Sequence, residues 1–325
     1  MDETLGERGE FSLIAAVTAR LPQGPQVLLG PGDDAAVLAA PDRRVVASTD
    51  LLVEGRHFRR DWSTGYQVGR KAAAANLADI AAMGALPTAL LVGLGAPAAL
   101  PVRWALDFAD GLRDECEPVG ASVIGGDVVG AEAVTIAATA LGDLAGREPV
   151  TRSSARPGEV VALAGRVGWS AAGFTLLTLA SVGDLGEVAE SPLIRAHLQP
   201  EPPYDAGPDA AEHGATAMID VSDGLVQDLG HIAAGSGVAI DVDPAALELT
   251  PLLAAAARVG VDPYDWVLAG GEDHALAATF PSAPGLPPGW RQIGRVLAGD
   301  GVTVAGQPYR GAGGWAHFSG NAPVP

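Results

Sequence analysis

The segment Ala217-Met218-Ile219-Asp220-Val221-Ser222-Asp223-Gly224 joins a short apolar run to two aspartates and a glycine. The apolar run predicts a strand over 217–221, and the residues that follow predict a turn into a helix over 224–234. Aspartate beside glycine is common at turns and helix N-caps, where the carboxylate accepts backbone N–H bonds and has no further role. Taken alone, the segment predicts a strand–turn–helix unit and leaves its chemistry open.

Acidic residues stand beside small residues at several other predicted strand ends. These segments are Gly32-Asp33-Asp34, Ser48-Thr49-Asp50, Gly125-Gly126-Asp127 and Gly270-Gly271-Glu272-Asp273. Asp79 lies on a predicted helix over 65–83, three residues after Asn76 and on the same helix face. Each motif by itself is ordinary turn chemistry. Together they favour a magnesium–phosphate site, because Mg²⁺ binds carboxylate and hydroxyl oxygens together with substrate phosphates.

Composition excludes several classes of protein. The chain has 325 residues and a formal net charge of −19, which argues against binding nucleic acid or an anionic membrane surface. Lys71 is the sole lysine and stands outside any Gly-Lys-Ser/Thr sequence, so a P-loop is excluded. With Cys116 as the sole cysteine, no intrachain disulfide forms. The acidic start, and an apolar stretch over 86–100 that proline and glycine interrupt, lead us to expect a cytoplasmic protein.

Helices and strands are mixed in both halves of the chain, which predicts an α/β domain followed by an α+β domain. Arginine, serine and proline concentrate near 147–158, so we place the domain boundary between 1–148 and 149–325. The segments 35–39 and 44–48 flank Pro41-Asp42 and predict a β-hairpin with an exposed edge. The segment Asp241-Val242-Asp243 imitates the start of a phosphatase motif. It continues with Pro-Ala and has no partner lysine nearby, so we interpret it as structural.

Taken as a set, these motifs closely resemble the thiamine-monophosphate kinase family. They follow the family's order and cover nearly the whole chain. The residues that carry the resemblance are 9–14, 32–36, 48–58, 76–85, 125–127, 163–165, 220–225, 270–273 and 314–318.

The resemblance implies a reaction in which ATP phosphorylates thiamine monophosphate to thiamine diphosphate. It also implies the two-domain fold of the aminoimidazole ribonucleotide synthetase superfamily and a homodimer formed through the N-terminal sheet. The family's magnesium ligands fall on Asp34, Ser48, Thr49, Asp50, Asp79, Asp127, Asp220 and Asp223. Its ATP contacts fall on Gly126, Asp127, Arg152 and Ser222, and its thiamine-phosphate contacts on His57, Glu272 and Trp315.

The expected mechanism is direct phosphoryl transfer without a phospho-enzyme, with Mg²⁺ and Arg152 stabilising charge. The acceptor phosphate is already anionic, so no general base is required. Three departures from the family pattern stand at Tyr204, His274 and Ala316. The alternatives are an aminoimidazole ribonucleotide synthetase-like enzyme and a non-catalytic nucleotide or metal module. A selenophosphate synthetase is disfavoured, because no early cysteine and lysine pair is present.

Overall fold

A computed structural model of the chain describes residues 3–32, 35–181, 191–309, 311 and 314. It divides into two compact units. The N-terminal unit contains Met1–Ile80 and Ala85–Gly146, and the C-terminal unit contains Ala81–Gly84 and Arg147–Pro323. Across the described residues, none of the helices combines the length and apolar character needed to cross a membrane.

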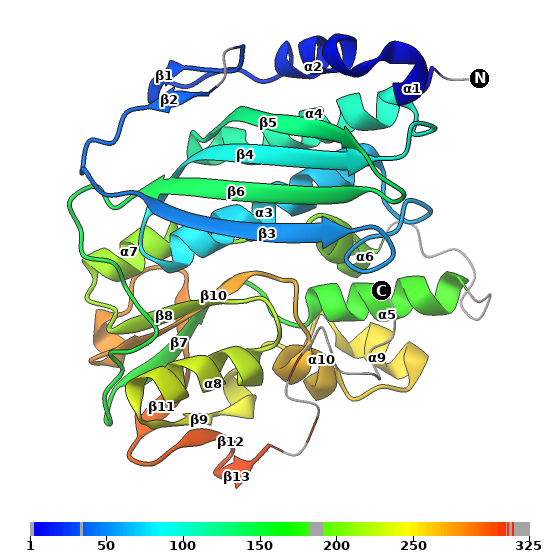
Figure 1. Cartoon of the computed structure of the whole chain (residues 1–325). Coiled ribbons are helices and arrows are strands. Elements are labelled where there is room, and N and C mark those ends of the chain that lie inside the picture. The colour runs from blue at the N-terminus through cyan, green and yellow to red at the C-terminus, as the bar shows by residue number, and fades with distance from the viewer. Residues whose placement is uncertain (1–2, 33–34, 182–190, 310, 312–313, 315–325) are drawn as a thin grey trace. The chain divides into compact units, whose positions relative to one another are not determined.

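The N-terminal unit is built on a four-stranded sheet with the order β3-β6-β4-β5 (Figure 1). Its strands are β3 (Val46–Val53), β4 (Leu86–Ala96), β5 (Ser122–Gly130) and β6 (Thr135–Asp143). The helices are α1 (Leu5–Arg8), α2 (Glu10–Thr18), α3 (Gly65–Ala82) and α4 (Val102–Cys116), followed by a short 3₁₀ turn over Glu117–Val119. The strands β1 (Val27–Leu29) and β2 (Val37–Leu38) form a separate two-stranded sheet.

The hairpin expected from 35–39 and 44–48 does not form. Val37 and Leu38 pair with β1, whereas β3 pairs with β6 over its whole length, from Val46 opposite Gly142 to Val53 opposite Thr135. The strand that follows Arg44 has eight residues, Val46–Val53, and extends beyond the expected segment. An eight-residue partner for β6 hydrogen-bonds far more backbone than the two-residue strand β2 offers, so β3 joins the larger sheet.

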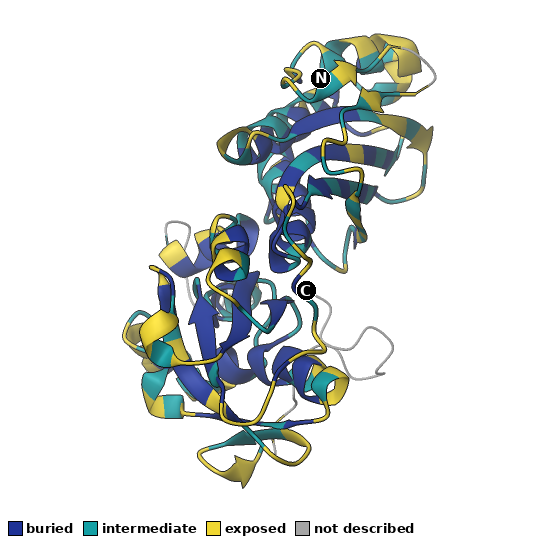
Figure 2. Ribbon diagram, turned by 90° about the vertical axis from the view of Figure 1, so that its left-hand side faces the viewer, coloured by how far each residue is buried: buried dark blue, intermediate teal, exposed yellow. Residues whose placement is uncertain are grey.

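One face of the N-terminal sheet is open to solvent. Burial alternates along β3 and β6, as the striped strands in Figure 2 show. The inward residues meet α3, which is buried from Ala72 to Ala78. The outward residues include Val45 and Leu51, with exposed fractions of 58% and 60%. A period of two along a strand is the signature of a sheet packed on one face.

The C-terminal unit holds a seven-stranded sheet with the order β13-β12-β9-β11-β7-β10-β8. Its strands are β7 (Val160–Ala164), β8 (Ala217–Val221), β9 (Ala239–Val242), β10 (Ala275–Phe280), β11 (Trp290–Leu297), β12 (Gly301–Val304) and β13 (Gln307–Pro308). The helices are α5 (Trp169–Ser181), α6 (Pro192–Leu198), α7 (Ala206–Glu212), α8 (Leu225–Ser236), α9 (Leu253–Val259) and α10 (Pro263–Ala269), with 3₁₀ turns at Pro244–Ala246 and Ala283–Gly285.

The strands β7, β10 and β8 form one end of this sheet, and nearly all of their residues are buried. Every residue of β8 and β10 is buried, and both β8 and β7 pair antiparallel with β10. Phe280 and Trp290 meet edge to face in the core, with ring centroids 5.3 Å apart. The strands expected at 160–164, 217–221, 275–280 and 301–304 are confirmed. The fold therefore places Asp220, near the end of β8, beside the start of β10.

Candidate functional site

In the N-terminal unit, β3 and α3 bring together three of the acidic and hydroxyl groups expected to bind metal. Ser48 Oγ lies 2.5 Å from Asp79 Oδ2, to which it donates a hydrogen bond. The backbone N–H of Asp50 donates to Asn76 Oδ1 at 3.2 Å, and Asn76 Nδ2 donates in turn to the carbonyl of Ala72. The Asn76 amide thereby gives the Asp50 N–H a hydrogen-bond acceptor on the edge strand β3. Asn76 is fully buried, and the sequence placed it on the Asp79 face without assigning it a role.

Thr49 projects to the other face of the sheet. Its hydroxyl donates to the carbonyl of Ala138 at 2.9 Å and accepts from the Thr139 hydroxyl at 3.0 Å. Successive side chains of a strand point to opposite faces, so the Thr49 hydroxyl lies apart from Ser48 and Asp50.

Asp50 and Asp127 stand at opposite edges of the same sheet. The register runs from Asp50 across Ala138 and Val92 to Gly126, the residue before Asp127. Three strand spacings separate the two ends of this row, which amounts to roughly 14 Å. Asp127 is exposed, and its Oδ1 accepts from the N–H of Val128. One ion cannot touch both carboxylates within a single unit, whereas separate ions along a bound polyphosphate are compatible with this spacing.

The other residues predicted to contact substrate, His57 and Arg152, have different surroundings. His57 is half-buried after β3, and its Nδ1 accepts the N–H of Val53 at 3.0 Å, which leaves the proton of a neutral ring on Nε2. The Arg152 side chain is exposed, while its carbonyl accepts from the Ser236 hydroxyl. Asp34 and Trp315 lie outside the described residues.

In the C-terminal unit, Asp220 pairs with a residue that departs from the family pattern. Asp220 Oδ2 lies 3.2 Å from Nδ1 of His274, and both side chains are buried. The antiparallel register of β8 and β10 sets this pair up, because Val221 lies opposite Ala275, the residue after His274. The imidazole therefore faces one of the expected metal ligands.

The Ser222-Asp223-Gly224 turn is held by an aspartate that the sequence did not single out. Asp228 Oδ2 accepts the N–H of Asp223 at 3.0 Å and the N–H of Gly224 at 3.1 Å. Burial, with the nearby carboxylates of Asp220 and Asp223, raises the pKa of Asp228 to about 7, although both N–H donors favour its ionised form. An aspartate in the first turn of the helix after an Asp-Gly pair is the sequence signal for this arrangement.

The Gly270-Gly271-Glu272-Asp273 turn packs directly on that segment. The Glu272 N–H donates to the Ser222 carbonyl at 2.8 Å, and a Cβ at Gly271 would lie 2.1 Å from the same carbonyl oxygen. Glu272 adopts a left-handed backbone with φ of +65°. Only glycine permits the approach at 271, and the contact holds Glu272 in a conformation that non-glycine residues rarely adopt. The Glu272 carboxylate remains 34% exposed.

Asp273 is the buried member of this turn. Its Oδ1 accepts the N–H of Ser170 at 2.9 Å, at the start of α5, while Oδ2 has no hydrogen-bond partner among the residues that the structure describes. Burial raises the pKa of Asp273 to about 7, against the backbone N–H groups of Ser170 and Gly168. The turn is thus anchored to the N-terminus of α5 by a carboxyl group that is costly to ionise.

The donor chemistry fits Mg²⁺, since the groups gathered in each unit are carboxylate, hydroxyl and amide oxygens. Each unit supplies part of the expected set: Ser48, Asp50 and Asp79 on one, and Asp220 and Asp223 on the other. Among the described residues, which omit Asp34, no three histidine, cysteine or acidic side chains form a ready-made metal cluster.

A groove of about 1100 Å³ runs through the N-terminal unit beside two of the glycine-rich motifs. It is lined by Gly30, Pro31 and Gly32 and by Gly125-Gly126-Asp127, and its walls are mainly apolar. Backbone N–H groups near glycines suit phosphate oxygens, and apolar walls suit a flat heterocycle.

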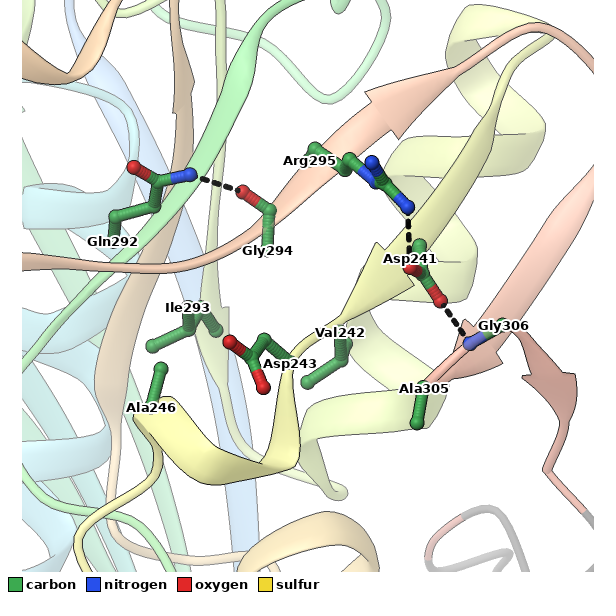
Figure 3. A pocket seen from close by; sticks show the side chains of 10 residues that line it. All are labelled: Asp241, Val242, Asp243, Ala246, Gln292, Ile293, Gly294, Arg295, Ala305 and Gly306. Atoms are coloured by element: carbon green, nitrogen blue, oxygen red, sulfur yellow. Dashed lines mark hydrogen bonds and ion pairs between the residues drawn. The ribbon is translucent and has the colours of Figure 1, made fainter.

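A second hollow lies at the end of β9 and beside the middle of β11 (Figure 3). Its acidic residue Asp241 accepts hydrogen bonds of 2.7 Å from the Thr303 hydroxyl and from the Gly306 N–H, and faces Arg295 at 3.4 Å. Burial opposes ionisation, but these partners hold the pKa of Asp241 below its ordinary value. Asp241 ties β9 to the β12–β13 turn, which agrees with the structural interpretation of the Asp241-Val242-Asp243 motif.

Comparison with known proteins identifies the class of protein to which the chain belongs. Residues 32–144 match the family model described as AIR synthase related protein, N-terminal domain. A thiamine-monophosphate kinase of Mycobacterium tuberculosis is 51% identical over 318 residues, covering 97% of this chain and 93% of that protein. The corresponding Corynebacterium glutamicum protein is 42% identical, with 97% and 95% covered. A solved structure described as "AaThiL complexed with AMPPCP and TMP" has a TM-score of 0.78 and 34% identity, with 96% and 98% covered.

The fold is therefore that of the AIR synthase-like proteins, and its mixture of helices and strands is as expected. The chain belongs to the thiamine-monophosphate kinase family, and it is an enzyme of the phosphotransferase class. The resemblance inferred from the sequence motifs is confirmed.

Proposed function

We propose that this chain transfers the terminal phosphoryl group of ATP directly to the phosphate of thiamine monophosphate, giving ADP and thiamine diphosphate. The observation that carries the proposal is full-length identity of 51% to a thiamine-monophosphate kinase, in a chain whose acidic turns stand at strand ends in both units. The neighbour solved with AMPPCP and TMP supports the same pair of ligands. Identity of this extent favours the kinase over an AIR synthase-like sibling.

The residues that would hold Mg²⁺ are Ser48, Asp50, Asp79 and Asp127 in the N-terminal unit and Asp220 and Asp223 in the C-terminal unit, with Asp34 and Thr49 also predicted. Bound Mg²⁺ neutralises charge on the phosphates, a duty that a P-loop lysine performs elsewhere. Asn76 orients the Asp50 backbone, and Asp228 orients the Asp223 turn. These hydrogen bonds to Asn76 and Asp228 hold Asp50 and Asp223 in position before substrate binds.

The substrate contacts divide by charge. The Glu272 carboxylate offers a negative group to the thiazolium cation. The exposed Arg152 guanidinium and the backbone at Gly126 are suited to the ATP phosphates. The acceptor phosphate needs no base, because it is anionic at neutral pH. In this scheme the protein chiefly positions ATP and thiamine monophosphate, and it reduces the repulsion between their phosphates.

A coupled assay for ADP release tests the reaction. We expect release that depends on both thiamine monophosphate and Mg²⁺ and that stops when EDTA is added. Release that requires an aminoimidazole ribonucleotide precursor in place of thiamine monophosphate would favour the sibling enzyme, and no release with either would favour a non-catalytic nucleotide or metal module. With ATP chiral at the γ-phosphorus, direct in-line transfer inverts the configuration, whereas a phospho-enzyme retains it.

The open face of the N-terminal sheet supports the further proposal of a homodimer. Its exposed apolar side chains include Val45 and Leu51 beside and on β3, Leu91 on β4 and Val129 on β5. Contiguous exposed apolar surface is unusual for a monomer. A second copy presents the same residues and covers the face by two-fold symmetry.

A further inference from the structure

A buried histidine lies beside Glu272 and has no role in the predicted site. His197 lies on α6 and is 4% exposed, and its Nδ1 is 3.7 Å from Glu272 Oε2. The same nitrogen is 3.0 Å from Ser170 Oγ, on the first turn of α5. The Phe174 ring packs beside the imidazole, with ring centroids 5.6 Å apart. None of these three residues belongs to the predicted site.

The position of His197 depends on a close helix contact. A Cβ at Gly173 on α5 would lie 2.1 Å from the Leu193 carbonyl of α6 and 3.0 Å from His197 Cβ. Glycine at 173 lets α6 approach α5 until the imidazole reaches over Ser170. Ser170 is itself tied to the Glu272 turn, since its N–H donates to Asp273. Backbone and side-chain contacts thus connect α5, α6 and the turn that carries Glu272.

We propose that His197 is a positioning residue for thiamine monophosphate: with Ser170 it orients the Glu272 carboxylate toward the thiazolium cation. The inference rests on the proposed function. A distance of 3.7 Å is too long for a direct hydrogen bond, but the two side chains remain within electrostatic reach, since His197 is buried and Glu272 is only partly exposed. A neutral imidazole that carries its proton on Nδ1 presents a positive edge to Oε2 of Glu272. The substrate class that this arrangement selects is an organic cation bearing a phosphate.

The test is a double-mutant cycle with separate KM values for thiamine monophosphate and ATP. In His197→Phe we expect the KM for thiamine monophosphate to rise about tenfold, as for loss of one contact to a charged group, and the KM for ATP to change less than about twofold. In the Glu272→Gln background the same substitution should change neither KM by more than about twofold. His197→Asn, whose amide nitrogen can stand near the Nδ1 position, should restore part of the loss.

The matched control is His213→Phe, at an exposed histidine after α7, which should leave both KM values unchanged. Melting curves establish that each variant is folded. If His197→Phe does not fold, Ser170→Ala takes its place in the cycle, with an expected rise of about threefold in the KM for thiamine monophosphate alone.

An unchanged KM for thiamine monophosphate in a folded His197→Phe protein overturns the inference. An equal rise in both KM values, or the same rise in the Glu272→Gln background, overturns it as well, because either result marks a merely structural histidine. If the wild type is active but Glu272→Gln changes neither KM, the proposed role of Glu272 and this inference are both wrong. The proposed reaction still stands in that case. A wild type that releases no ADP with thiamine monophosphate overturns the proposed function, and the inference falls with it.

Discussion

The hydroxyl of Ser48 on β3 hydrogen-bonds Oδ2 of Asp79 on α3, across 31 positions of sequence. This contact places two of the expected magnesium ligands on the packed side of the N-terminal sheet, beside the half-buried Asp50. The alternation of β3 determines which side chains share this location, because Ser48 and Asp50 face α3 while Thr49 faces away. The following predictions test what these groups do.

Asp50→Asn should abolish turnover and preserve the fold. The substitution removes a charge but keeps size and shape, and Asp50 is half-buried at a sheet edge rather than in the core. We expect kcat to fall at least about 100-fold, since the chain has no P-loop lysine to replace a lost metal ligand. Steady-state ADP release and thermal melting measure the two effects. The control is Asp61→Asn, at an exposed aspartate paired with Arg59, which should stay active. Near-normal magnesium-dependent turnover in folded Asp50→Asn would remove Asp50 from the metal set.

The protein should sediment as a homodimer at micromolar concentration. Leu51→Glu introduces a charge on the edge strand β3 of the open sheet face, where the leucine is 60% exposed, and should give monomers. Leu253→Glu is the matched control, because Leu253 is a 51% exposed leucine of the C-terminal unit. That variant should remain dimeric. Sedimentation velocity of the wild type and both variants measures their oligomeric state. A monomeric wild type would refute the proposed interface.

Glu272→Gln should weaken binding of thiamine monophosphate far more than binding of ATP. An opposite charge in a partly desolvated site is worth about 1–3 kcal/mol, or roughly tenfold and more in affinity. The alternative is that Glu272 serves the metal set, as another acid in a Gly-Gly turn. A role in the metal set would raise the magnesium requirement and the KM for ATP together. Measuring both KM values and the magnesium dependence of one variant separates the two roles.

The sequence predicted strands best where apolar runs are short and continuous, as at β7, β8 and β10. These strands are buried on both faces, so local composition and tertiary environment agree. The hairpin near Pro41 was wrong because turn residues indicate a reversal without identifying the strands that pair. The helix α10 was missed, although Asp262 caps it through the Tyr264 N–H and Pro263 occupies its first turn.

For the site, the sequence indicated the acidic turns but not the groups behind them. Asn76 and His197 lie beside residues that only the fold brings near, whereas Asp228 is five residues from Asp223 and has a local sequence signal. His197 is 75 residues from Glu272, and only the close packing of α5 on α6 makes them neighbours. Motifs report groups that recur together along the chain, whereas positioning contacts depend on tertiary packing.

Asp273 should make the stability of the protein fall as pH rises from about 4 to about 7. Burial raises its pKa to about 7 in the folded protein, from 3.8 for the unperturbed group. The folded state therefore holds a proton that the unfolded state has lost in this window. The stabilisation is complete below pH 4 and disappears as pH rises through 7. Asp273→Asn keeps an acceptor for the Ser170 N–H and cannot ionise. We therefore expect the unfolding free energy of this variant, minus that of the wild type, to increase by on the order of 4 kcal/mol between pH 4 and pH 8.

Urea unfolding at a series of pH values, without magnesium, measures this difference directly. Asp61→Asn is again the control, with the opposite sign: the hydrogen bond from Arg59 lowers the pKa of Asp61, so its contribution is present at neutral pH and is lost in acid. For that variant the same difference should stay flat or fall slightly as pH rises, because an exposed pair contributes little. A flat difference for Asp273→Asn would mean that the carboxyl ionises freely in the folded protein. The N–H groups of Ser170 and Gly168 would then outweigh burial, and the turn that carries Glu272 would be anchored to α5 by a full negative charge at the helix N-terminus.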